Sequence, residues 1–345
     1  NARMLSELVR PEHENDPDEL LRDRFLCRGG GLLLCGPTGI GKSSWAMQCA
    51  ILWALGRDCF DIQSARSLRS LLIQAENDDG DLAEMRDGVI AGLGLNADDA
   101  KAACENILVV REDSRTGLDF FQTVVRPSLA KHQPDLLWID PAFAYLGGEA
   151  TAQKDVTQFL RNYLNPLLRE FNCGVVVVHH TNKPPTGKEK SKWSGNDFAY
   201  LGSGSIEWAN WARAILALRG KGSHEVFELR AGKRGARLGW KETDGSTTCY
   251  AKLIAHAKGR GVICWREADP NEIQTGGRPK SSDSEEILEL LPPGGLTAGE
   301  WMELAKSECG ISDATFHRHR RALIAAELIL KSTTSKKWQP ITQNS

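Results

Sequence analysis

The sequence predicts an α/β protein with a mostly parallel central sheet, followed by a small C-terminal module. Between Gly31 and about Trp265, short and continuously apolar runs alternate with longer helical patterns. A glycine-rich segment, residues 36–43, lies between one such run and a helical pattern. The composition then shifts to Gly, Pro, Ser and Thr around residues 269–283. We therefore expect a large domain over 1–268, a linker over 269–283 and a small domain over 284–345.

The apolar runs are the expected strands. The first five show no polar alternation, which is typical of parallel strands covered on both faces, whereas the later three indicate more exposed hairpins. In chain order they are Leu32–Cys35, Leu71–Gln74, Ile107–Val110, Leu136–Ile139, Val175–Val178, Ala214–Leu218, Val226–Arg230 and Ala251–Ala255. Helical patterns such as Ser43–Leu55 and Val156–Glu170 fit the crossovers between parallel strands. The segment from Asp16 to Glu19 is expected to open a short helix.

Composition restricts the class of protein. The chain has 345 residues, 41% apolar and 26% charged, which excludes a fibrous or largely disordered protein. The net charge of −2 indicates no global basic field, so any nucleic-acid site must be a local patch. No apolar run approaches the length of a membrane span, and no secretory signal is recognised at the start. Nine scattered cysteines without a C-x-x-C pair favour reduced thiols in a cytoplasmic protein, without a zinc site.

A phosphate-binding loop is the most specific motif. The segment has the pattern G-x-x-x-x-G-K-S between an apolar strand and a helix; its residues are Gly36, Pro37, Thr38, Gly39, Ile40, Gly41, Lys42 and Ser43. Glycines allow the backbone N–H groups to converge on phosphate oxygens, and the helix N-terminus adds positive partial charge. Lys42 would neutralise the β- and γ-phosphates, Ser43 would ligate magnesium, and Ser44 follows them in the helix.

Acidic and basic side chains follow the other expected strands. Asp140 ends the run Leu136–Ile139 and is expected in the magnesium shell beside Ser43. Since Pro141 follows it, a general base must come from elsewhere, and Glu76 after the second strand is the best candidate. His180 follows Val175–Val178 and could sense the γ-phosphate, whereas His179 would face the other side of the strand. Glu76 could instead be an exposed loop residue, and the two histidines a solvated pair at the start of a loop.

These motifs together resemble the RecA-type P-loop ATPases of the plasmid RepA-like hexameric helicase group, an AAA_25-like group. The resemblance covers about residues 25–265. It depends on the order of Gly36–Ser43, Ala75–Asn77, Leu136–Asp140, Val178–Lys183, Gly202–Ser205 and Trp211–Arg213. It implies a RecA-like fold, ATP hydrolysis with Mg²⁺, and a homo-oligomeric ring, usually a hexamer, with nucleotide sites between neighbours. It also suggests replication of a mobile element.

The resemblance also assigns roles to residues. Lys42 and Ser43 match the phosphate-loop pair, and Glu76 the catalytic glutamate. Asp140 matches the aspartate of the second motif, and His180 the γ-phosphate sensor. Arg213 resembles the arginine finger donated across the subunit interface. Lys233 and Arg234 resemble the basic finger on a late strand; Arg237 is near enough to compete, and these arginines could equally be surface ion-pair partners.

The pattern of the C-terminal region predicts three helices followed by a small hairpin, an order that resembles a winged helix. The expected helices are Ser284–Leu291, one opened by the capping box at Thr297–Glu300 and running to about Ser307, and one capped by Ser312 and running to about Ala326. Over residues 310–340, Arg318, Arg320, Arg321, Lys331, Lys336 and Lys337 outnumber Asp313 and Glu327. The module is expected to bind duplex DNA or, alternatively, to be a protein-interaction domain.

We expect an ATP-driven, ring-forming motor that acts on DNA, a replicative helicase-like protein. The loop at 184–202 could line a channel for single-stranded DNA, with Lys188, Lys190 and Lys192 near phosphates and Trp193 available for stacking. The alternative is an ATP-gated DNA-binding, loading or regulatory ATPase that unwinds nothing. A small-molecule kinase is a third possibility, against which the paired histidines and the separation of Glu76 from Asp140 count.

Overall fold

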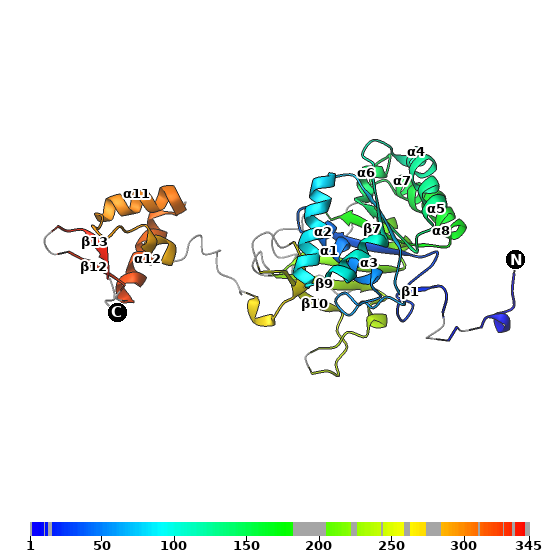
Figure 1. Ribbon diagram of the computed structural model, residues 1–345, viewed down its shortest axis with the longest axis horizontal. Coiled ribbons are helices and arrows are strands. Elements are labelled where there is room, and N and C mark those ends of the chain that lie inside the picture. The colour runs from blue at the N-terminus through cyan, green and yellow to red at the C-terminus, as the bar shows by residue number, and fades with distance from the viewer. Residues whose placement is uncertain are drawn as a thin grey trace. The chain divides into compact units, whose positions relative to one another are not determined.

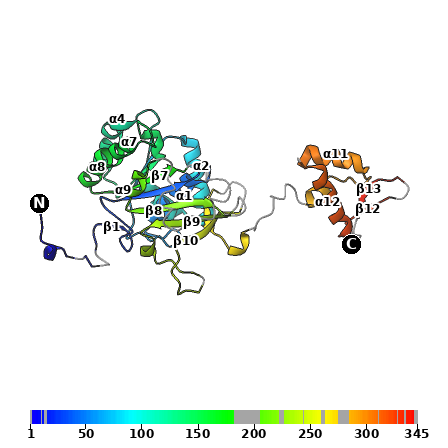
Figure 2. The same cartoon turned by 180° about the vertical axis from the view of Figure 1, so that it is seen from behind.

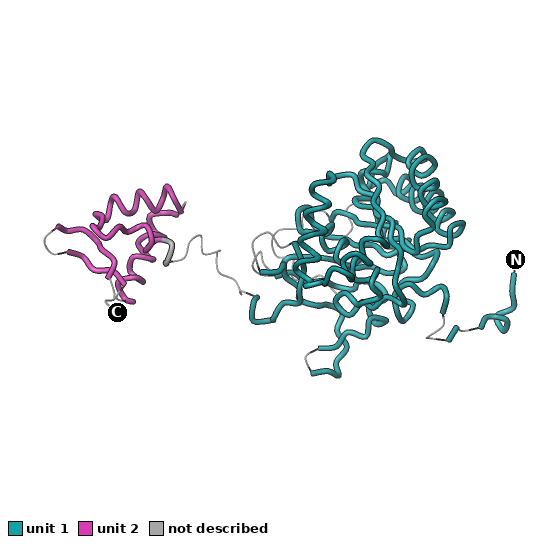
Figure 3. Tube along the Cα trace, in the orientation of Figure 1, with its two compact units in different colours: residues 1–273 teal, residues 274–345 magenta. Residues whose placement is uncertain are grey.

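The computed structural model describes most of the chain, in two compact units formed by residues 1–273 and 274–345 (Figure 3). The described residues are 2–9, 11–12, 16–181, 205–221, 226–242, 244–258, 263–273, 284–309, 311–326, 328–332 and 335–341. All nine cysteines are free thiols, and six of them are buried. No helix of the described residues has the length and apolar character needed to span a membrane.

The first unit is built on a nine-stranded sheet in the order β11-β10-β9-β8-β3-β7-β6-β4-β5. From β8 to β5 neighbouring strands are parallel, and β9, β10 and β11 are added antiparallel. The strands are β3 (Gly31–Gly36), β4 (Ser70–Gln74), β5 (Ile107–Arg111), β6 (Leu136–Asp140), β7 (Gly174–His180), β8 (Ala214–Gly220), β9 (Val226–Lys233), β10 (Ala251–His256) and β11 (Trp265–Glu267). This confirms the predicted α/β class with a mostly parallel central sheet.

Helices cover both faces of the sheet (Figures 1 and 2). One hydrophobic cluster packs Leu32 and Leu34 of β3 against one set of helices, and a second packs Leu33 and Cys35 against the other set. The first set is α1 (Lys42–Ala54), α2 (Asp79–Leu93) and α3 (Ala97–Glu105). The second is the π-helical η2 (Phe120–Val125), α5 (Arg126–His132), α6 (Ala142–Tyr145), α7 (Gln153–Thr157), the π-helical η3 (Gln158–Leu164), α8 (Asn165–Glu170) and α9 (Glu207–Trp211). The short α4 (Gly117–Asp119) precedes η2.

Three sequence expectations about this unit are wrong. The segment predicted to open a helix near Asp16 leads into a strand, β1 (Glu19–Leu21), paired with β2 (Leu26–Cys27). Leu20 and Leu21 point to opposite sides of this strand, and both are fully buried. Strand β5 is not covered on both faces, because it forms the edge of the sheet and leaves Val109 44% exposed.

The third wrong expectation is that the last three predicted strands form exposed hairpins. Strands β8 and β9 do form a hairpin, but their side chains are largely buried. Even Glu228 is only 2% exposed, because Arg219, Lys221 and Arg230 surround its carboxylate at 2.7–2.9 Å. These charge-assisted hydrogen bonds let a charged residue occupy a buried strand position.

The elements around the hairpins complete the unit. The strand β11 was not predicted, since three residues give no pattern. The 3₁₀ turns among the described residues of this unit are η1 (Leu5–Glu7), η6 (Gly235–Leu238) and η7 (Pro270–Glu272). The last lies at the start of the expected linker, where the Glu272 carboxylate accepts two hydrogen bonds from Arg266 at 2.8 and 2.6 Å. Residues 274–283 of that linker lie outside the described residues.

The second unit contains α10 (Ser284–Glu289), α11 (Ala298–Cys309), α12 (Asp313–Ala325), β12 (Ile329–Lys331) and β13 (Trp338–Pro340). Strands β12 and β13 are antiparallel, and Leu296 adds an antiparallel bridge to Trp338. The predicted caps are present: Thr297 and Glu300 hydrogen-bond reciprocally, and Ser312 accepts from the Thr315 N–H. Trp301 and Phe316 are fully buried at the centre of this unit's own core.

Candidate functional site

The loop after β3 has the shape that phosphate binding requires. Gly39 and Gly41 have φ angles of +74° and +88°, a region that side chains disfavour, and α1 begins directly afterwards at Lys42. The turn therefore directs backbone N–H groups and the positive end of a 13-residue helix toward one point. The turn lies at the carboxyl edge of the parallel strands, where open α/β sheets bind ligands, and its geometry suits an anion.

The ammonium group of Lys42 lies inside this loop. Its Nζ donates to the carbonyl oxygens of Gly36 at 3.0 Å and Pro37 at 2.8 Å, and lies 3.0 Å from Nδ1 of His180. The residue is only 5% exposed. Burial lowers the pKa of Lys42, and the carboxylates of Asp140 and Glu76 partly offset that shift. The charge is thus held by neutral acceptors that a phosphate oxygen could replace.

Asp140 lies beside this lysine at the end of β6, where it is 4% exposed. The Gln74 amide, at the end of β4, donates to its Oδ2 at 2.9 Å, and Asn77 donates to Gln74 at 3.0 Å. Burial raises the pKa of Asp140, against hydrogen bonds from Ser43 and Gln74 that lower it. The Ser43 hydroxyl and the Asp140 carboxylate are hard oxygen donors of the kind that Mg²⁺ accepts alongside nucleotide phosphates, so these residues fit that ion.

Glu76 and His180 face each other beside the loop. Nε2 of His180 is 3.9 Å from Oε1 of Glu76, which is largely exposed, and Nδ1 is 3.3 Å from the Thr38 hydroxyl. Burial, followed by the positive charge of Lys42, lowers the pKa of His180, so the ring is neutral at pH 7. His179 points the other way, as strand alternation predicts, and stacks on Trp208 of α9 with ring centroids 4.3 Å apart.

A second set of residues beside the loop was missed by the sequence reasoning. Trp265 of β11 donates its indole N–H to the Ser44 hydroxyl at 3.0 Å, and Ser44 donates to the Gly41 carbonyl at 2.8 Å. Gln48 of α1 accepts from the Trp265 N–H at 2.7 Å and donates to its carbonyl at 3.0 Å. Trp265 and Ser44 are 221 positions apart, and no local pattern signals such a contact.

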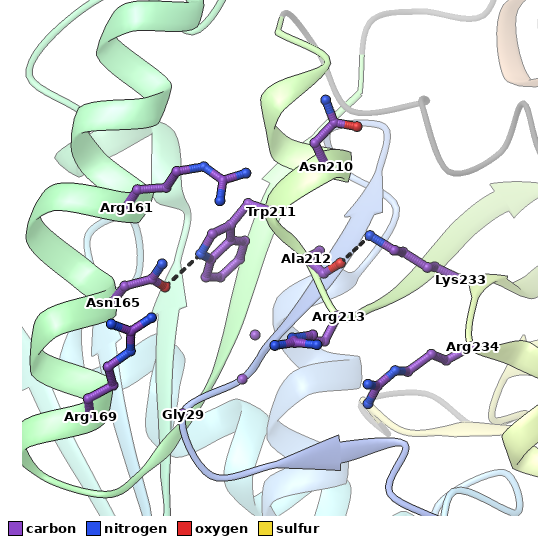
Figure 4. A pocket seen from close by; sticks show the side chains of 12 residues that line it. Gly29, Arg161, Asn165, Arg169, Asn210, Trp211, Ala212, Arg213, Lys233 and Arg234 are labelled. Carbon is purple, nitrogen blue, oxygen red and sulfur yellow. Dashed lines mark hydrogen bonds between the residues drawn. The ribbon is translucent and has the colours of Figure 1, made fainter. Parts of the chain in front are cut away.

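Arg213, Lys233 and Arg234 lie at the opposite edge of the sheet. They line a cavity of about 390 Å³ with Arg161 of η3 and Arg169 of α8 (Figure 4). Lys233 donates to the carbonyls of Ala209 and Ala212, and Arg161 pairs with the buried Glu207. Among the described residues, no carboxylate contacts Arg213, Lys233 or Arg234. Burial lowers the pKa of Lys233, and the positive charges of Arg213, Arg234 and Arg161 lower it further. An anion in this cavity would relieve that repulsion.

The two sites cannot serve one bound molecule within a single chain. Arg213 donates its backbone N–H to Gly31 at the start of β3, and the phosphate loop begins at Gly36, the last residue of that strand. Six extended residues span roughly 20 Å. Arg237 does not line the cavity; it donates instead to the Asp23 carbonyl at 2.7 Å.

The mostly parallel sheet and the glycine turn between β3 and α1 together define an α/β domain with a P-loop. The sequence profile of the AAA_25 family, described as an AAA domain, matches residues 6–186, and the chain belongs to this family. Among solved structures, the crystal structure of the RadB recombinase aligns with 14% identity and a TM-score of 0.45, over 70% of this chain and 92% of that chain. No curated protein matches the sequence.

Part of the expected site lies outside the described residues. This applies to Asn182 and Lys183, to the loop at 184–202 with Lys188, Lys190, Lys192 and Trp193, and to Gly202–Gly204. Within the described part of the chain, no group of three or more His, Cys, Asp or Glu side chains is placed to hold a metal ion. The magnesium assignment therefore depends on the pair Ser43 and Asp140 together with phosphate oxygens.

Gln74→Leu tests the support of Asp140. Removing the amide leaves the buried carboxylate without one of the hydrogen bonds that orient it. We expect the Mg²⁺ concentration for half-maximal nucleotide binding to rise by about 10- to 100-fold, measured by calorimetry across a Mg²⁺ series. Gln122→Leu, the same change at an exposed position of η2, is the control. Equal Mg²⁺ dependence in both variants would contradict the role of Gln74.

Proposed function

We propose that this protein hydrolyses ATP and acts on DNA as a ring-forming, helicase-like motor. The observation that carries the proposal is the meeting of Lys42, Asp140, Glu76 and His180 around one glycine turn, although they come from four separate parts of the chain. Membership of the AAA_25 family supports nucleotide hydrolysis as the chemistry of this turn. The finer assignments, helicase, hexamer and replication of a mobile element, come from the sequence resemblance.

In the proposed reaction, each residue has a task that its position supports. The loop N–H groups and Lys42 bind the β- and γ-phosphates, and Lys42 gives up its contacts with the Gly36 and Pro37 carbonyls to do so. Ser43 and Asp140 hold Mg²⁺, which when bound neutralises charge on the phosphates. Glu76 orients a water molecule and accepts its proton. His180 exchanges its contact with Lys42 for one with the γ-phosphate, and so reports whether the phosphate is present.

Arg213 is proposed as a finger donated to a neighbouring subunit. An arginine beside the transferring phosphoryl group stabilises its negative charge, and Arg213 is held about 20 Å from the loop of its own chain. Head-to-tail contacts would place the basic cavity of one subunit against the phosphate loop of the next, and such contacts close into rings. Lys233 and Arg234 would add positive charge at the same place.

DNA contact is proposed for the second unit. Its order of three helices, with a bridged strand and a hairpin, is typical of winged-helix domains, in which the third helix enters the major groove. Arg318 and Arg321 of α12 are exposed, as that role requires. Arg320 and His319 are not available in the same way: Arg320 lies over the rings of Phe316 and Trp338 at 5.7 and 5.5 Å, and His319 is 5% exposed.

Glu76→Gln should separate binding from hydrolysis. The amide keeps the shape of the side chain but accepts no proton, so we expect ATP turnover to fall by about 10²- to 10⁴-fold with unchanged ATP affinity. Lys42→Ala should lose affinity itself. Phosphate release and calorimetry are the measurements, with Glu84→Gln, an exposed position on α2, as the control for the charge change. Full turnover in Glu76→Gln would exclude it as the base.

Arg213→Ala tests action between subunits. Alone, the variant should lose roughly 10³-fold or more in turnover. Mixed in equal amounts with Glu76→Gln, it should regain activity, because about a quarter of head-to-tail sites would combine an intact Glu76 with an intact Arg213. The control mixture replaces Glu76→Gln with the double variant Glu76→Gln/Arg213→Ala. No recovery in the first mixture would argue that Arg213 does not act across an interface.

Strand displacement separates the motor from the alternative, an ATP-gated DNA loader, which the winged-helix-like order of the second unit favours. On a forked DNA duplex with ATP, the motor releases one strand, and Lys42→Ala does not. A loader would instead bind the duplex more tightly with ATP and leave it intact. Tight ATP-dependent binding without strand release would therefore replace the first function with the second.

A further inference from the structure

We infer that the face of the His256 imidazole, backed by Trp265 and Phe227, stacks on the nucleobase of the bound triphosphate. This inference rests on the proposed function, because it names the part of the site that receives the nucleoside. No sequence motif marks these residues, and all three lie outside the matched residues 6–186.

The direction of the bound nucleotide follows from the strand order. His180, Asp140 and Glu76 follow β7, β6 and β4, which lie on one side of β3 in the sheet. A γ-phosphate attacked by a water at Glu76 must lie on this side of the loop. The nucleoside is at the other end of the triphosphate, so it must leave the loop on the opposite side, where β8, β9, β10 and β11 lie.

An aromatic cluster lies on that opposite side. His256, at the end of β10, is paired in register with Trp265 of β11, and their ring centroids are 4.0 Å apart. Phe227 of β9 packs edge-on against both rings, at 5.1 and 5.2 Å. Trp265 is 2% exposed and Phe227 8%, whereas His256 is exposed. The cluster thus has one exposed ring, that of His256, which packs against two buried rings.

This cluster touches the phosphate loop itself. A side-chain carbon at Gly41 would lie 2.8 Å from Trp265 and 3.0 Å from Cε1 of His256, so the rings lie directly against the loop backbone. The Ser44 hydroxyl and the Gln48 amide fix Trp265 in place, because they bind its indole and both of its backbone polar groups. Trp265, against which the His256 ring packs, is therefore held at a set position beside the loop.

The chemistry of the open ring suits a nucleobase. Burial lowers the pKa of His256, which keeps the imidazole neutral at pH 7, and a neutral aromatic face stacks on any base. No side chain in the described part of the chain hydrogen-bonds its ring nitrogens, which leaves them for the ribose or base edge. The phosphates would be held by the loop and the base by the hairpin, on either side of Gly41.

The test compares ATP with inorganic tripolyphosphate, which has the phosphates but no base. For the full-length protein, we expect His256→Ala to weaken ATP binding by about tenfold and to leave tripolyphosphate binding unchanged. His256→Phe should retain ATP affinity, because it keeps the stacking face. Calorimetry measures both ligands, and His132→Ala, at the end of α5, is the matched control.

The outcomes distinguish this inference from the function on which it rests. Unchanged ATP affinity in His256→Ala, or equal weakening of ATP and tripolyphosphate, would overturn the stacking role while leaving nucleotide binding intact. Loss of ATP affinity in His256→Phe as large as in His256→Ala would overturn it as well. A wild-type protein that binds neither ligand would overturn the proposed function, and this site with it.

Discussion

The backbone of the turn at Gly39 and Gly41 is the constraint on which the rest of the structure depends. Both residues have positive φ angles, and Gly41 leaves no room for a side chain against Trp265 and His256. That turn sets where α1 starts, and the start of α1 sets the positions of Lys42, Ser43 and Ser44. Side chains from strands on both sides of β3 therefore lie beside the same loop. The strands range from β4 on one side of β3 to β11 on the other.

The two sides of the loop differ in chemistry because different strands supply them. On the side of β7, β6 and β4, strand ends carry ionisable side chains, and the buried Asp140 carboxylate accepts from Gln74, which in turn accepts from Asn77. On the side of β8 to β11, antiparallel hairpins bring aromatic rings against Gly41. The parallel strands thus provide the proposed reaction, and the added hairpins provide the proposed recognition of the base.

Most of the fold could be predicted from sequence, and so could the residues beside the phosphate loop that follow β4, β6 and β7. Asp140, Glu76 and His180 could be predicted near the loop because each follows an apolar run, and the ends of parallel strands meet at one edge. The positions of Trp265, Gln48 and His256 near the loop could not be predicted. Trp265 contacts Gln48 from 217 positions away, and it lies on a strand of only three residues, which leaves no pattern in the sequence. Expected exposure also failed where ion pairs bury a charge, as they do at Glu228.

The basic cavity shows why assembly and hydrolysis would be coupled in the proposed motor. Arg213, Lys233 and Arg234 lie close enough to repel one another, and their own chain supplies carbonyl oxygens but no carboxylate among its described residues. The isolated subunit therefore bears an electrostatic cost that an external anion removes. A neighbour's triphosphate is such an anion, so its binding would favour the interface, and the interface would complete the site. Loss of the γ-phosphate would then weaken the same contact, which is how a chemical step could be converted into relative movement of two subunits.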